Sequence, residues 1–159
     1  MQIVLRTATL EDYDVLHLLY AQLDQIHAKA IPEFFRSVEE PVRSCEYFAE
    51  IIANKDAALF VAEHEGTLVG AIHCFIDSTP EIPFIVPRRF VFIADIVVDE
   101  NFQRRGVGQA LLERVDLWAG EKGLTEVVLG VWEFNTAARF LYEKLGYYTS
   151  WRRMRKQLH

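Results

Sequence analysis

Cysteine is scarce in this chain and long apolar runs are missing, and both shortages narrow the classes of protein to which it can belong. The 159 residues include two cysteines, Cys45 and Cys74, both beside apolar or aromatic residues, which predicts buried thiols rather than a disulfide framework. Although 51% of the residues are apolar, no run is long enough to cross a membrane. Residues 1–10 lack the basic and apolar regions of a secretory signal. We therefore expect a cytoplasmic protein without a membrane partner.

Positive charge is also in short supply, because 17 Lys and Arg stand against 23 Asp and Glu, for a formal net charge of −6. General nucleic-acid binding needs a basic surface, so nucleic acid is not an expected partner. Residues 1–100 carry 7 basic and 17 acidic side chains, a balance of −10, whereas residues 101–159 carry 10 and 6, a balance of +4. This division favours an anionic cofactor bound by the second part and a cationic molecule bound by the first.

The pattern of apolar residues predicts a single domain over residues 1–159, with an α/β (α+β) fold. Locally paired strands followed by a β-α-β-α-β order indicate a mixed sheet flanked by helices. Three prolines, Pro80, Pro83 and Pro87, predict a loop over residues 78–88. Strands are expected at residues 3–6, 58–63, 68–76, 90–98, 126–132 and near 148–155. Helices are expected at residues 9–27, 41–54 (with Pro41 in the first turn), 106–122 and 135–145.

The most informative segment is Gln-Arg-Arg-Gly-Val-Gly at residues 103–108, between a predicted strand and a predicted helix. Such a junction presents the unpaired N–H groups of the first helical turn and the positive end of the helix dipole. Glycine there allows a phosphate to approach the backbone closely. The segment is not a P-loop, because Gly108 is followed by Gln109 and Ala110, nor a dinucleotide fingerprint, because Leu111 replaces the third small residue. The alternative is a chance pair of glycines in a loop.

A second segment, some thirty residues further along the chain, has the pattern Asn-x-x-Ala-x-x-Leu-Tyr-x-x-x-Gly-Tyr, formed by Asn135, Ala138, Leu141, Tyr142, Gly146 and Tyr147. Together with Gln103, Gly106 and Gly108, it resembles the motifs of the GNAT superfamily of acyl-CoA N-acyltransferases. The N-terminal half is similar only in its order of elements. The resemblance implies acetyl-CoA as cosubstrate. It also implies that two parallel strands, residues 90–98 and 126–132, splay apart to admit it.

The resemblance also assigns roles to particular residues. Backbone N–H groups near residues 96–98 would hold the thioester carbonyl, and Tyr142 would protonate the leaving thiolate. Since Tyr142 follows Asn135 by seven residues, about two turns, both side chains are expected on one helix face. The alternative for Tyr142 is a core residue with a satisfied hydroxyl. The expected cofactor-binding residues are Ile96, Val97, Val98, Gln103, Arg104, Arg105, Gly106, Val107, Gly108, Gln109, Asn135 and Tyr142.

Asp95 is the one charged residue in the apolar run 90–98. An unpaired carboxylate inside a sheet costs several kcal/mol, so Asp95 should face a wet cleft, hold a cationic acceptor, or pair with Arg88 or Arg89. The stretch Asp-Ile-Val-Val at 95–98 is similar to the Asp-Leu-Tyr-Val of diamine (spermidine/spermine-type) acetyltransferases, in which the Asp lines the amine site. Those enzymes have a glutamate, proposed as base, where this chain has Ala94, so that base is not carried over.

The acceptor side has further candidates. His27, near the end of the first predicted helix, is expected beside the acceptor and could relay a proton, although a lone histidine is also compatible with simple packing. Phe34, Phe35, Tyr47 and Phe48 form either an acceptor wall or core. No residue spacing suggests a metal, and no Ser or Cys nucleophile motif is present, so direct transfer in a ternary complex is the expected mechanism.

The sequence thus predicts an N-acetyltransferase that moves the acetyl group of acetyl-CoA to a primary amine of a small, cationic acceptor. Two other functions stay open, a non-catalytic CoA-binding or sensory module and a protein N-terminal acetyltransferase. The presence of both Asn135 and Tyr142 favours the enzyme. Formation of a homodimer also stays open.

Overall fold

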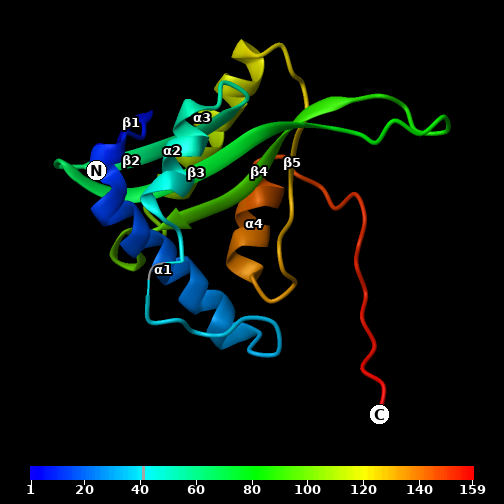
Figure 1. The fold of residues 1–159 in the computed structure, drawn as a ribbon, viewed down its shortest axis with the longest axis horizontal. Helices are drawn as coiled ribbons and strands as arrows, with labels where there is room; N and C mark the ends of the chain where they lie inside the picture. Colours follow the sequence, from blue (N-terminus) through cyan, green and yellow to red (C-terminus); the bar gives the residue numbers. More distant parts are fainter. Residues whose placement is uncertain (41) are drawn as a thin grey trace.

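The computed structural model describes residues 1–40 and 42–159, and its centre is a sheet with helices on both faces (Figure 1). Over these residues the sheet has five strands in the order β1-β2-β3-β4-β5. β1 to β4 pair as antiparallel neighbours and β5 runs parallel to β4, which confirms the predicted mixed sheet. The strands are β1 (Val4–Thr7), β2 (Ala57–His64), β3 (Thr67–Ser78), β4 (Arg89–Val98) and β5 (Val127–Leu129).

The helices bury two separate cores against the two faces of the sheet. α1 (Tyr13–Ala30) and α2 (Cys45–Ala53) cover one face, and α3 (Val107–Glu121) and α4 (Thr136–Lys144) cover the other. Successive side chains of β2 point to opposite faces of the sheet and show this division. Leu59 and Val61 belong to the α1–α2 core, whereas Phe60 belongs to the α3–α4 core. Within the described residues, no helix is long and apolar enough to span a membrane.

Three predicted elements differ from the structure. The second helix begins at Cys45, because the Ser44 hydroxyl accepts a hydrogen bond from the Tyr47 N–H and caps it there. Pro41, placed in its first turn by the sequence, lies outside the described residues. The strand predicted at 126–132 is paired only over Val127–Leu129. The strand near 148–155 is wrong, since that segment runs away from the sheet without a partner among the described residues (Figure 1).

An extra residue in β4 determines toward which face of the sheet the Asp95 side chain points. His73 of β3 is opposite Asp95 whereas Cys74 is opposite Ile93, so Ala94 forms a β-bulge. Val91 and Ile93 face α3, and in a regular strand Asp95 would face α3 as well. The bulge reverses the alternation, so that Asp95 turns toward Tyr20 of α1.

β4 and β5 separate after a short paired stretch. Their register ends at Ile93 opposite Leu129, while β4 continues to Val98 with no strand on this side in the described part of the chain. This confirms the predicted splay. The Asp99 N–H donates to the Val69 carbonyl of β3, so alternation directs the N–H groups of Ile96 and Val98 the opposite way, into the gap.

Candidate active site

The loop before α3 has the geometry of an anion site. Gly106 is the N-cap of α3 with φ of +84°, and Arg104 also has a positive φ of +60°, so the loop curls tightly at two points. The Ala110 N–H donates to the Gly106 carbonyl over 3.0 Å. The N–H groups of Val107, Gly108 and Gln109 come earlier in the helix and therefore have no helical carbonyl to which they can donate. These amides and the exposed, positively charged Arg104 can face a pyrophosphate.

The two motif glycines are required for different reasons. A Cβ on Gly106 would meet no atom within 4 Å, so its requirement is the left-handed backbone. A Cβ on Gly108 would lie 3.3 Å from Leu141 Cδ2 and 3.8 Å from Val98 Cγ2. Gly108 therefore lets α4 pack directly on the first turn of α3, beside the splayed end of β4. This contact brings the helix that carries Tyr142 to the gap.

Tyr142 lies on α4 with only 9% of the residue exposed. Burial raises the pKa of its hydroxyl above the ordinary value, so the group stays protonated near neutral pH. Its ring is 5.7 Å from that of Tyr147, and both belong to the α3–α4 side of the molecule. A protonated hydroxyl on a helix that packs beside the gap is suited to donate to a leaving thiolate.

Asn135 lies just before the first residue of α4, so the expected helix face shared by Asn135 and Tyr142 stays a prediction. Asn135 is the N-cap of α4, with φ and ψ of −84° and 70°, and its side chain turns back onto the helix start. Its Oδ1 accepts a hydrogen bond from the Ala138 N–H over 3.2 Å. The spacing of Asn135 and Ala138 is thus explained by capping. A contact of Asn135 with the cofactor stays a prediction.

Asp95 is held by side chains that the sequence did not indicate. The Tyr20 hydroxyl donates to Asp95 Oδ1 over 2.5 Å, and His73 Nδ1 lies 3.9 Å from Oδ2. Burial and the neighbouring charge of Asp95 raise the pKa of Tyr20 well above its ordinary value, so this hydroxyl remains a donor. Arg88, a suggested ion-pair partner, instead lies 3.6 Å from Glu126.

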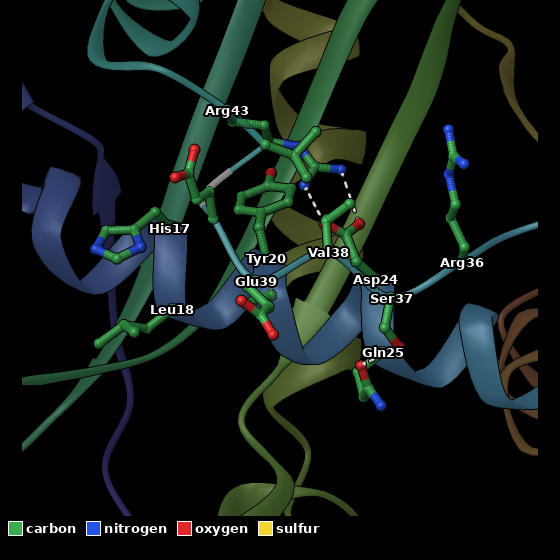
Figure 2. A pocket seen from close by; sticks show the side chains of 13 residues that line it. His17, Leu18, Tyr20, Asp24, Gln25, Arg36, Ser37, Val38, Glu39 and Arg43 are labelled. Carbon is green, nitrogen blue, oxygen red and sulfur yellow. Dashed lines mark hydrogen bonds and ion pairs between the residues drawn. The ribbon is translucent and has the colours of Figure 1, made fainter.

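A pocket of ≈ 230 Å³ opens along α1 next to this cluster (Figure 2). Arg43 reaches across it from the loop before α2, with its guanidinium carbon 4.5 Å from the centre of the Tyr20 ring. Arg43 Nη1 is 2.9 Å from Asp24 Oδ2, and Figure 2 shows this pair bridging the helix and the loop. The charged residues of the lining are Asp24, Arg36, Glu39, Glu40 and Arg43.

Two turns further along α1, His27 joins an aromatic rim that we define as His27, Phe34, Phe35, Trp132 and Phe134. Ring centres within the rim are 5.4 to 5.8 Å apart, and the rim joins the loop after α1 to the loop after β5. Phe34 is 47% exposed and is not core, whereas Phe48 is 1% exposed and is core; an acceptor wall at Phe34 stays a prediction. Tyr47, at 37%, is also partly exposed.

His27 and Asp95 lie in separate contact groups. His27 Nδ1 is 2.9 Å from the Leu23 carbonyl, and because a carbonyl only accepts, Nδ1 carries a hydrogen and donates it. His27 follows Tyr20 by seven residues, or about 10 Å of helix. The imidazole that contacts Asp95 is therefore His73. His73 had a signal in the sequence, as a polar residue within the apolar run 68–76, whereas Tyr20, Trp132 and Phe134 had none.

A sheet splayed beside a glycine-rich helix start is the architecture of acyl-CoA N-acyltransferases. The model of the Acetyltransferase (GNAT) family matches residues 22–147, and the chain therefore belongs to this family. It is an acyl-CoA-dependent acetyltransferase, as the sequence predicted.

Relatives of the chain agree with this assignment. The chain is 31% identical over 148 residues to an N-alpha-acetyltransferase of Sulfurisphaera tokodaii, covering 90% of this chain and 78% of that protein. A mutant form of the BH1408 protein from Bacillus halodurans has a TM-score of 0.92 and 25% identity, covering 98% of this chain and 99% of that one. AAC(6')-Iy, solved with the bisubstrate analog CoA-S-monomethyl-acetylneamine, shares the fold with a TM-score of 0.75 and 20% identity, covering 100% and 99%.

Proposed function

We propose that this acetyltransferase moves the acetyl group of acetyl-CoA directly to a primary amine of a small, cationic acceptor, with both molecules bound at once. The observation that supports this most is the bulge at Ala94, which turns Asp95 out of the α3 core and toward Tyr20, a residue that lines the pocket along α1. A carboxylate so placed can hold an ammonium group beside the gap between β4 and β5.

On the cofactor side, the amides of Val107, Gly108 and Gln109 would bind the pyrophosphate at the start of α3. Gln103 Nε2 donates to the Val98 carbonyl over 3.3 Å, which ties this loop to the end of β4. The N–H groups of Ile96 and Val98, directed into the gap, would bind the pantetheine arm and the charge that develops on the thioester oxygen. Tyr142 would then supply a proton to the thiolate.

On the acceptor side, Tyr20, Asp24 and His27 recur at positions i, i+4 and i+7 of α1 and form one face of the helix. This face leads from Asp95, through the pocket, to the aromatic rim. A carboxylate beside an ammonium stabilises the charged form of the amine. Asp95 therefore orients the acceptor, and another group must finally take the proton.

A second acceptor class is the α-amine of a polypeptide N-terminus. It is favoured by one observation, the 31% identity to the archaeal N-alpha-acetyltransferase. The aromatic rim would then contact the side chains that follow the terminal amine. Its exposed rings, Phe34 and Trp132, are suited to that contact as well.

Thiol release from acetyl-CoA with matched acceptors separates these functions. The panel holds diamines and aminoglycosides, the corresponding alcohols, and short peptides with free or blocked N-termini. We expect saturable, amine-dependent release that is fastest with a small cation. Faster release with free peptides would favour the second class. CoA binding without release on any amine would leave a binding module and contradict the proposal.

A further inference from the structure

His73, on β3, is a buried imidazole beside the carboxylate that would hold the acceptor. Only 8% of the residue is exposed, and its Nδ1 has no hydrogen-bond partner within the described part of the chain. A buried polar nitrogen without a hydrogen-bond partner is destabilising, so its presence at this position needs an explanation. We propose that His73 is the final proton acceptor of the reaction and takes the proton of the acceptor ammonium through Asp95. This inference rests on the proposed function.

The strand register brings the two groups together. His73 and Asp95 are directly opposite each other on β3 and β4, and the bulge at Ala94 places both side chains on the α1–α2 face. The distance from His73 Nδ1 to Asp95 Oδ2 is 3.9 Å, about 1 Å longer than a hydrogen bond. Hydrogen bonds used in proton transfer are often long before the substrate binds and shorten afterwards.

Tyr20 gives the carboxylate a fixed orientation. Because the Tyr20 hydroxyl occupies Oδ1, the other oxygen, Oδ2, is the one that faces His73. The Phe75 ring, 5.9 Å from the His73 ring on the same strand, limits the positions open to the imidazole. The remaining titratable and charged groups around the pair are Tyr20 from α1, Tyr47 and Glu50 from α2, Asp56 before β2, and Arg43 over the Tyr20 ring.

The imidazole also has a route to solvent. A second pocket, of ≈ 270 Å³, lies between α2 and β3 and is lined by His73 together with Glu50, Asn54 and Asp56. His73 therefore touches Asp95 on one side and an acidic, water-accessible pocket on the other. A proton that reaches the ring can leave through this pocket without passing back through the acceptor site.

The proposed transfer balances as follows. One N–H bond of the ammonium breaks, its electron pair remains on nitrogen, and the proton passes to Asp95 Oδ2 and then to His73 Nδ1. The neutral amine attacks the thioester carbon, and the C–S bond breaks. Tyr142 gives a proton to the sulfur, and the nitrogen then loses a second proton, which restores the Tyr142 hydroxyl. The imidazolium releases its proton to water in the α2–β3 pocket, so one proton is released per acetyl group transferred.

The test compares two acceptors of the same shape, an alkylamine that is protonated at the assay pH and a fluorinated analogue that is mostly neutral there. The variants are His73→Asn, which keeps a polar group near Nδ1 but cannot take a proton, and His27→Asn, which removes the other imidazole of the acceptor side. We expect His73→Asn to lower kcat about 10²-fold with the alkylamine and less than about threefold with the neutral analogue. His27→Asn should change the KM for the acceptor and affect kcat equally with the two amines.

Equal losses of kcat on both amines with His73→Asn would show a structural role and overturn the inference. A loss of kcat that is confined to the alkylamine and appears in His27→Asn, but not in His73→Asn, would overturn it as well. If His73→Asn does not fold, His73→Gly assayed with added imidazole gives the same decision, since free imidazole should restore alkylamine turnover. Failure of that rescue in a folded His73→Gly contradicts the relay. If the wild type acetylates neither amine, the proposed function itself fails, which is a different result.

Discussion

At the scale of residues, the two ends of the proposed transfer would use side chains with opposite tasks. Tyr142 is buried among apolar groups, and this burial raises the pKa of its hydroxyl, which keeps the proton near neutral pH. Asp95 is held by Tyr20 on the α1–α2 side of the sheet, and 15% of its side chain is exposed. Tyr142 could be predicted because a motif spacing marks it. The surroundings of Asp95 could not, because Tyr20 and His73 reach it only through the tertiary packing of α1 and β3.

Replacement of Tyr142 by phenylalanine tests the proton donor. Tyr142→Phe keeps the ring in its core position, so CoA affinity should be unchanged while kcat falls by about 10²-fold, as expected for a lost general acid. Tyr148→Phe is the matched control, because Tyr148 is 86% exposed and its change should leave kcat unaltered. Pre-steady-state and steady-state rates measure both. A kcat within about twofold of wild type, with chemistry rate-limiting, would remove Tyr142 from the mechanism.

The orienting role of Asp95 can be measured apart from proton removal by using a weakly basic amine. With that acceptor, Asp95→Asn should raise the KM for the amine about tenfold, the value of one charge-assisted hydrogen bond, and leave kcat and the KM for acetyl-CoA nearly unchanged. Asp77→Asn, at the exposed end of β3, serves as control. If Asp95→Asn changes only the melting temperature, Asp95 is a structural partner of Tyr20 and the acceptor binds elsewhere.

At the scale of elements, the start of α3 and the end of β4 would build the proposed cofactor site together. The turn at Gly106 exposes the helix amides, and Gly108 allows α4 to close the gap. A Cβ at Gly108 would lie 3.3 Å from Leu141 Cδ2, so a substitution there requires the Leu141 side chain to shift and affects the contact between α3 and α4 as well as any phosphate. A substitution that adds a charge therefore tests the role of the first turn of α3 more clearly than one that adds a bulky side chain.

Gln109→Glu adds a carboxylate to the third position of α3, beside the proposed pyrophosphate. The charge favours the helix dipole but opposes Glu113, which now accepts from the Gln109 amide over 2.9 Å, and these small effects should nearly cancel in stability. We expect a roughly tenfold weaker CoA Kd in calorimetry at low salt, and less at high salt. Leu117→Glu, on the exposed side of α3, should leave the Kd unchanged. Equal affinities would place the phosphates elsewhere.

How far elements can be predicted from the sequence depends on whether their determinants are local. The hairpin of β2 and β3 follows from two apolar runs separated by a turn at Glu65 and Gly66, and both residues have the positive φ that such a turn requires. The bulge at Ala94 depends on how β3 and β4 are aligned, which no local pattern encodes. The segment 148–155 has strand-like residues, but a strand also needs a neighbour with free backbone groups.

At the scale of the whole molecule, the gap between β4 and β5 lies between two differently charged regions. The segment with a balance of +4 supplies the loop, α3 and α4, and the segment with −10 supplies α1, α2 and the pocket along α1. Such a division favours approach of an anionic cosubstrate and a cationic acceptor from different sides. Assembly into a homodimer stays a prediction, for sedimentation to decide.

The affinity of a CoA–amine conjugate, with the acceptor amine joined through an acetyl group to the CoA sulfur, tests the central claim that one site holds both reactants for direct transfer. Calorimetry should give a Kd at least about 10²-fold below that of CoA, since the conjugate spans both halves of the site. Asp95→Asn should remove much of this gain and leave the Kd of CoA itself unchanged. A conjugate that binds no more tightly than CoA would contradict a shared site in the gap between β4 and β5.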